Sequence, residues 1–294
     1  YRTKLSAVRE TFILLGLFTS LCIPMVFSID NAGLAKYLVK LTLISGFIGI
    51  FFLCFFIKEK DSKKKKINFK EVFFNILSNQ RLVKLLTIFL INSFANVLPM
   101  ILFAFYISYV LDGTDYDRQK TLFFYFLFAI IGVPFWTKLS EITNKARSWS
   151  ISLVGSSLFF IFVIFLEQGD LLLFILISCL TGFCLGADLV LPPSIQADMT
   201  DIHKQKYKVE ISGVLFSLIT SINKLSFALG SFFVFGILGI LGFSTESETS
   251  ENSKNFIIFA YSILPVILKT ISFFMLRNFK SSQSEIRQIQ KKNN

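Results

Sequence analysis

The chain has 294 residues, of which 53% are hydrophobic and 17% are charged, and its formal net charge is +11. So few charged side chains cannot cover a water-soluble surface, and so much apolar surface excludes a disordered chain. The only histidine is His203, and the four cysteines all lie inside apolar runs without a CxxC pair. Histidine-based catalysis, zinc sites and disulfide frameworks are therefore not indicated. The composition is that of an integral membrane protein.

Eight apolar runs are long enough to cross a hydrocarbon layer of about 30 Å, which requires about 20 helical residues. All are predicted to be helices, because lipid offers no hydrogen-bond partner to an unpaired backbone group. In chain order they cover 11–29, 37–57, 83–111, 120–138, 149–167, 171–195, 212–243 and 256–276. The predicted fold class is an all-α integral membrane protein with eight transmembrane helices.

Basic residues are divided unequally between the two ends of these helices. One end receives 23 of the 30 lysine and arginine residues and the other receives four. Cytoplasmic loops are the ones that are rich in Lys and Arg, so both ends of the chain are predicted to be cytoplasmic. The expected location is the cell (inner or plasma) membrane. The positive charge thus reports topology, and no nucleic-acid partner is expected.

The longest predicted cytoplasmic connection, 58–82, separates two predicted helices from six. This division fits the last two helices of an N-terminal bundle at 1–57, a basic linker, a C-terminal six-helix bundle at 83–277 and a cytoplasmic tail at 278–294. The polar, basic start of the chain is unlike a signal peptide. We interpret the chain as N-terminally truncated, with four helices preceding it.

Three stretches carry a family resemblance. They are YRTKLSAVRE at 1–10, PFWTKLS at 134–140 followed by NKAR and Trp149, and LPPSIQADMTD at 191–201 followed by NKL at 223–225 and ALG at 228–230. In order and spacing they resemble the glycoside–pentoside–hexuronide:cation symporters, the melibiose-permease-like branch of the major facilitator superfamily. One departure is Glu210-Ile211-Ser212-Gly213, where the family usually has R-x-E-G.

The resemblance implies helices five to twelve of the twelve-helix major facilitator fold. It implies secondary active transport of a sugar or related solute coupled to Na⁺ or H⁺, without enzymatic activity. Most coupling-cation ligands of the family lie on helix two, which this chain lacks, so no cation ligand is assigned. No cofactor or bound metal is expected. The expected partners are a small-molecule solute, the cation and the bilayer, with the protein acting as a monomer.

Ionisable side chains inside membrane spans are costly and indicate functional sites by default. Asp188 lies ten residues before Asp198, which marks the cytoplasmic edge, and therefore about 15 Å deep. Lys224 lies twelve residues beyond Ser212, at about 18 Å. The matching depths predict that Asp188 and Lys224 face a central cavity and pair. The alternative is that Asp188 satisfies a backbone or hydroxyl group at a helix interface.

Other polar side chains in the spans complete the predicted solute site. Asn92 and Asn96 lie four residues apart, and their amides can both donate to and accept from sugar hydroxyls. The alternative for these groups is hydrogen bonding between helices. Tyr106 is expected to close the outer end of the cavity, and Tyr125 to stack on a sugar ring. The predicted substrate-binding set is Lys224, Asp188, Asn92, Asn96, Thr220, Tyr106 and Tyr125.

Prolines and loop charges suggest the moving parts. Proline removes a helical hydrogen bond and permits a bend, and broken helices are common at transporter sites. Pro99, Pro192 and Pro193 are therefore predicted hinges, with a purely structural kink as the alternative. The family resemblance assigns a cytoplasmic gate network to Asp198, Asp201, Lys204, Glu210 and Lys145.

The leading hypothesis is a cation-coupled symporter that works by alternating access. Two alternatives keep the same fold: a carrier of a lysolipid or another amphiphilic solute, and a non-transporting membrane sensor or scaffold. A polytopic membrane enzyme would need several histidines or clustered carboxylates at the interface, and the sequence shows neither.

Overall fold

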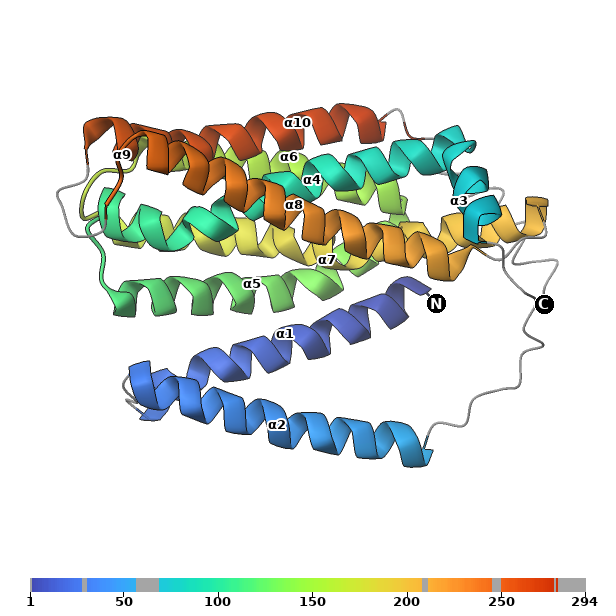
Figure 1. Ribbon diagram of the computed structural model, residues 1–294, viewed down its shortest axis with the longest axis horizontal. Helices are drawn as coiled ribbons and strands as arrows, with labels where there is room; N and C mark the ends of the chain where they lie inside the picture. The colour runs from blue at the N-terminus through green and yellow to red at the C-terminus, as the bar shows by residue number, and fades with distance from the viewer. Residues whose placement is uncertain are drawn as a thin grey trace.

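The computed structural model describes the backbone of residues 2–27, 31–56, 69–207, 211–244, 250–277 and 279. Side chains are described at 7–20, 36–56, 73–205, 211–244, 250–277 and 279. Every regular element in these ranges is a helix (Figure 1). The all-helical prediction is therefore confirmed for the described part of the chain.

The described chain contains ten α-helices. They are α1 (Arg2–Phe27), α2 (Asn31–Phe56), α3 (Phe69–Leu77), α4 (Gln80–Phe105), α5 (Asp115–Ile142), α6 (Lys145–Ile161), α7 (Leu171–Tyr207), α8 (Ser212–Ile240), α9 (Glu251–Ile258) and α10 (Leu264–Arg277). Three short segments of altered pitch extend or join them: the π-helical η1 (Tyr106–Val110) and η3 (Phe259–Ile263), and the 3₁₀-helical η2 (Phe162–Phe165).

Seven helices of the described chain are long and apolar enough to cross a membrane. They are Lys36–Phe56, Gln80–Val110, Asp115–Ile142, Lys145–Phe165, Leu171–Gln205, Ser212–Ile240 and Glu251–Arg277. Each coincides with one of the eight predicted runs. The eighth run, 11–29, falls in α1, a helix of 26 residues whose side chains are described only from 7 to 20.

Polar caps explain why several helices begin before their apolar runs. The Asn79 side chain accepts hydrogen bonds from two backbone N–H groups at the start of α4. Thr114 and Asp117 form a capping box at the start of α5. The Asn144 carboxamide oxygen accepts from the Arg147 N–H, at 2.6 Å, at the start of α6. Such caps satisfy otherwise orphaned N–H groups, and they add polar residues that a search for apolar runs leaves out.

The helices from α4 to α10 run side by side as one bundle, with the short α3 at one end of it (Figure 1). Helix α1 packs along α5 and α7, and α2 lies outside it (Figure 1). Leu14 of α1 packs against Ala129 and Val190, and the Phe18 and Phe123 ring centroids are 4.7 Å apart. None of the described side chains of α2 is buried. Its apolar surface is thus open to the bilayer or to further protein.

The bundle has a separate hydrophobic core toward each end. One core surrounds Trp149 and includes Leu85, Leu191 and Leu215. The other surrounds Tyr106 of η1, which stacks on Tyr261 of η3 with ring centroids 4.4 Å apart and planes at 18°. The two π-helical segments therefore face each other. Such bulges are frequent at functional sites, because they shift side chains around the helix axis.

Glycines allow α5 and α7 to approach closely. A Cβ added to Gly182 would lie 2.2 Å from the carbonyl oxygen of Tyr125, and one added to Gly186 would lie 2.9 Å from that of Ala129. Glycine at these two positions thus permits a backbone contact that any larger side chain would prevent. Trp136 is buried in this contact, where its indole N–H donates to the Phe183 carbonyl at 2.7 Å.

The predicted hinge prolines Pro192 and Pro193 lie inside an uninterrupted helix. Helix α7 continues through both prolines and ends at Tyr207, so the loop expected after 195 is helical. The two prolines only leave the carbonyls of Asp188 and Leu189 without a helical N–H donor. The only histidine, His203, lies in this part of α7 and is buried. Whether these prolines act as hinges stays a prediction.

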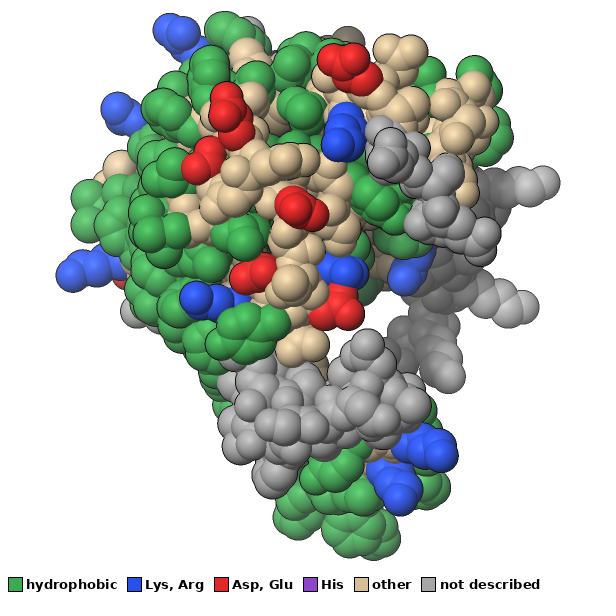
Figure 2. All heavy atoms as spheres, turned by 90° about the vertical axis from the view of Figure 1, so that its left-hand side faces the viewer, with side chains coloured by type: hydrophobic (Ala, Val, Ile, Leu, Met, Phe, Trp, Pro, Cys, Tyr) green, Lys and Arg blue, Asp and Glu red, His purple; other side chains and the backbone are tan. Residues whose placement is uncertain are grey.

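The two ends of the bundle differ in charge. Figure 2 shows the end at which α5 begins, and acidic side chains are prominent there. The connections at this end supply Asp112, Asp115, Asp117, Glu167, Asp170 and Glu251. Among the described residues, the opposite end carries the basic side chains Arg81, Lys84, Lys138, Lys145, Arg147, Lys204 and Arg277. This agrees with the charge division on which the predicted orientation rests.

Candidate functional site

A buried ion pair lies inside the bundle. The Lys269 Nζ atom of α10 is 3.2 Å from the Asp188 Oδ2 atom of α7, and the two side chains are only 6% and 8% exposed. A buried charge is tolerated in a bundle when it has a partner and its remaining hydrogen-bonding capacity is satisfied. Lys269 is the partner of Asp188, and other side chains satisfy the rest of the carboxylate.

Two further donors complete the surroundings of the Asp188 carboxylate. The Trp149 indole N–H of α6 donates to Oδ1 at 2.6 Å, and the Asn96 amide of α4 donates to Oδ2 at 3.2 Å. The carboxylate thus joins α4, α6, α7 and α10 through three charge-assisted hydrogen bonds, which are stronger than neutral ones. We call Asp188, Lys269, Trp149 and Asn96 the Asp188 cluster.

The cluster resolves the alternatives left by the sequence for Asp188. The predicted partner, Lys224, is exposed on α8, and its ammonium forms no ion pair with any described residue. Asp188 pairs with Lys269 instead. The prediction was wrong about the partner because depth along a helix can be counted from the sequence, whereas the direction in which a side chain points depends on how the helices pack.

Sequence reasoning overlooked two members of the cluster. Lys269 is not among the residues predicted for the solute site, and Trp149 enters only as part of a family motif. A usable signal existed for the lysine: Lys269 precedes the last residue of α10, Arg277, by eight residues, or about 12 Å. That depth resembles the depth estimated for Asp188. No comparable signal existed for Trp149.

Asn92 lies one helical turn before Asn96 and is buried, with 5% exposure. Its Oδ1 atom meets no donor within the described part of the chain. A buried acceptor without a partner costs on the order of 1–3 kcal/mol. The position is therefore suited to an external donor, such as water or a solute hydroxyl.

The other predicted solute ligands lie in different surroundings. Thr220 and Lys224 are both on the exposed side of α8, and beside them Asn223 accepts a hydrogen bond of 2.6 Å from Ser93 of α4. Tyr125 of α5 is partly buried and within electrostatic range of Asp188. Tyr106 is fully buried in the other core and donates to the Val163 carbonyl at 2.8 Å. Tyr106 thus packs the bundle and does not line an opening.

At the basic end of the bundle, Lys145 of α6 forms an ion pair with Asp198 of α7. The Lys145 ammonium also donates to the Ser194 carbonyl at 3.4 Å. Two of the five predicted gate residues are therefore in contact. Asp201 is partly buried and Lys204 is exposed further along α7, whereas Glu210 lies outside the described residues.

The described residues offer no cluster of metal ligands. No group of three or more His, Cys, Asp or Glu side chains within the described ranges could hold a metal ion. Within the described residues, the polar groups around Asp188 are therefore an amide, an indole and the Lys269 ammonium, which are groups that hydrogen-bond to polar partners.

The fold and this site define a polytopic α-helical membrane protein that carries polar and charged groups between its spans. Residues 1–282 match the family model of the MFS/sugar transport proteins. The chain belongs to that family, which confirms the resemblance to the melibiose-permease-like branch, and it is a membrane transport protein and not an enzyme. No curated protein matches the chain significantly.

Proposed function

We propose that this protein is a secondary active transporter that carries a sugar, glycoside or related solute together with Na⁺ or H⁺ by alternating access. Membership of the sugar transport family supplies the general activity. The proposed symport of a sugar-like solute rests on one observation, which is the polar face shared by α4 and α8. This face consists of Ser93 on α4 and of Thr220, Asn223 and Lys224 on α8. A solute path through a membrane has to be lined by such polar groups.

This face is best explained by an aqueous path. Thr220 and Lys224 are exposed one turn apart on α8, next to the Ser93–Asn223 hydrogen bond that connects α8 to α4. Lys224 lies near the middle of a 29-residue helix, where contact with hydrocarbon costs a few kcal/mol or more. The ammonium is therefore expected to face water, the solute or another part of the protein.

The solute site would combine this face with the buried amides behind it. Lys224 supplies donors, and the Thr220 hydroxyl, which itself donates to the Phe216 carbonyl, supplies an acceptor. Asn92 supplies an unsatisfied acceptor, and Asn96 is held by Asp188. Sugars carry many hydroxyl groups that each donate and accept, which such a mixed set can satisfy. Asp188, Lys269 and Trp149 would then position Asn96 and not touch the solute themselves.

Alternating access needs a closure at each side of the site. We assign the closure at the basic, predicted cytoplasmic end to the Lys145–Asp198 pair together with Asp201, Lys204 and Glu210. Pro99, Pro192 and Pro193 would allow α4 and α7 to bend as this closure opens. Cation binding would favour the solute-binding conformation, and the solute would favour cation binding by the same factor.

The test is uptake of radiolabelled sugars and glycosides by the full-length protein in sealed vesicles, with and without an imposed Na⁺ or H⁺ gradient. Gradient-dependent accumulation of a sugar is expected, with Lys224→Ala abolishing it while the protein still reaches the membrane. Lys138→Ala, which removes an exposed lysine from α5, is the matched control. Uptake that is independent of both gradients, or a Lys224→Ala variant as active as the control, would contradict the proposal. Accumulation of a lysolipid instead would establish the amphiphile alternative.

A further inference from the structure

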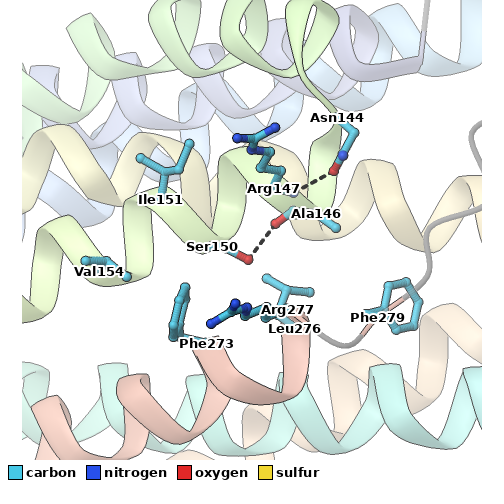
Figure 3. Close-up of a pocket in the computed structure, with 10 residues that line it drawn as sticks. All are labelled: Asn144, Ala146, Arg147, Ser150, Ile151, Val154, Phe273, Leu276, Arg277 and Phe279. Carbon is cyan, nitrogen blue, oxygen red and sulfur yellow. Dashed lines mark hydrogen bonds between the residues drawn. The ribbon is translucent and has the colours of Figure 1, made fainter.

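A groove lies between α6 and α10 on the side of the bundle, close to its basic end (Figure 3). It has a volume of about 500 Å³. Asn144, Arg147 and Ser150 line it from the start of α6, and Phe273, Arg277 and Phe279 line it from the end of α10 and just beyond. Figure 3 shows Arg277 extending between the two helices. The proposed solute path does not use this groove.

The groove carries uncompensated positive charge. Arg147 and Arg277 are both exposed, and neither guanidinium is paired with a carboxylate of the described chain. Arg118 at the opposite end, by contrast, forms an ion pair with Asp115. Two unpaired guanidiniums beside one groove suit a phosphate group, because each can offer two parallel N–H donors.

The walls of the groove are apolar and continue toward the middle of the membrane. Ile151 and Val154 of α6 are exposed along it, and Phe273 faces them from α10. Beyond the groove, Leu158 on α6 and Ile267 on α10 are also exposed. A ligand that fits both parts has a phosphate at the basic end and a hydrocarbon chain that extends away from it.

We propose that this groove is a binding site for an anionic phospholipid. Its phosphate would lie against Arg147 and Arg277, and one acyl chain would follow the apolar walls between α6 and α10. Basic pockets between membrane helices on the cytoplasmic side are suited to anionic headgroups. The apolar walls are what favour a lipid over a free anion, since inorganic phosphate would leave them unfilled.

The position of the groove connects it to the buried ion pair. The helices it separates are those that hold Asp188 from two sides, through Trp149 of α6 and Lys269 of α10. Arg147 precedes Trp149 by two residues. A lipid bound at both arginines would hold α6 and α10 together, and therefore stabilise the bundle when it binds.

The experiment measures lipid binding to the purified full-length protein by native mass spectrometry, in detergent doped with either phosphatidylglycerol or phosphatidylcholine. Each basic residue near an anionic headgroup contributes about fivefold to binding. Arg147→Gln/Arg277→Gln is therefore expected to weaken phosphatidylglycerol binding on the order of 25-fold. Lys138→Gln, which removes an exposed charge from α5, is expected to leave binding unchanged. Arg147→Lys/Arg277→Lys, which keeps both charges but loses the paired guanidinium donors, is expected to bind with intermediate strength.

A second measurement guards against a variant that is simply misfolded. Phosphatidylglycerol is expected to raise the melting temperature of the original protein, and to raise that of the Gln/Gln variant much less, while the two proteins melt alike without lipid. The proposal is overturned if the Gln/Gln variant binds phosphatidylglycerol as well as the original protein does. It is also overturned if phosphatidylcholine binds equally well, or if inorganic phosphate alone gives the same stabilisation.

Discussion

Replacing Lys269 by methionine tests the central interpretation of the Asp188 cluster. At 3.2 Å and an effective dielectric constant of about 20, the attraction between the two charges is about 5 kcal/mol. Desolvation of both groups offsets most of this, so the pair as a whole adds little net stability. Removing one partner is different, because the burial cost of the remaining charge is then uncompensated.

We therefore expect Lys269→Met and Asp188→Asn each to destabilise the protein by about 3–5 kcal/mol. The double variant removes both charges, and its cost is expected to fall at least 2 kcal/mol below the sum of the two single costs. Methionine has a similar length to the lysine stem, so packing changes little.

The assay is unfolding of the purified protein in detergent, followed by melting temperature and by denaturant titration for all three variants. Lys224→Met is the matched control, because it removes a lysine that is exposed and forms no described ion pair. Lys269→Met is expected to melt well below this control. The reasoning fails if the two variants melt together, or if the double variant is as unstable as the sum of the single ones.

Three further predictions concern packing, gating and local helix stability. Gly182→Val is expected to disrupt folding, because its Cβ would lie 2.2 Å from a backbone oxygen of α5. Gly236→Val meets open space and should be tolerated. The measurement is the yield of monodisperse protein for each variant, and equal yields would contradict the prediction. Lys145→Asp is expected to abolish solute uptake, because it places two carboxylates together. The exchanged variant Lys145→Asp/Asp198→Lys is expected to restore uptake. If it does not, the ion pair between these positions is not what closes the path. Thr114→Ala removes the capping box of α5 and is expected to cost about 1 kcal/mol, seen as a lower unfolding midpoint, while an unchanged midpoint would mean that the cap is dispensable.

Much of the architecture follows from the sequence because lipid imposes strong constraints on it. Runs of about 20 apolar residues have to be helices in a bilayer, and seven of the eight predicted runs coincide with apolar helices of the described chain. The close approach of α5 and α7 could also be anticipated, because glycine at 182 and 186 removes the side chains that would keep the backbones apart. The helix starts were placed too late, since caps such as Asn144 are polar.

Only the tertiary structure decided which polar groups meet. The sequence placed Asp188 and Lys224 at similar depths, but depth is one coordinate, and the rotation of each helix about its axis is set by packing against all its neighbours. That packing turns Lys269 and Trp149 toward Asp188 and leaves Lys224 exposed. It likewise brings Arg147 and Arg277, 130 positions apart in the chain, to one groove. Spans are local properties of a sequence, whereas sites depend on contacts between helices that are distant along it.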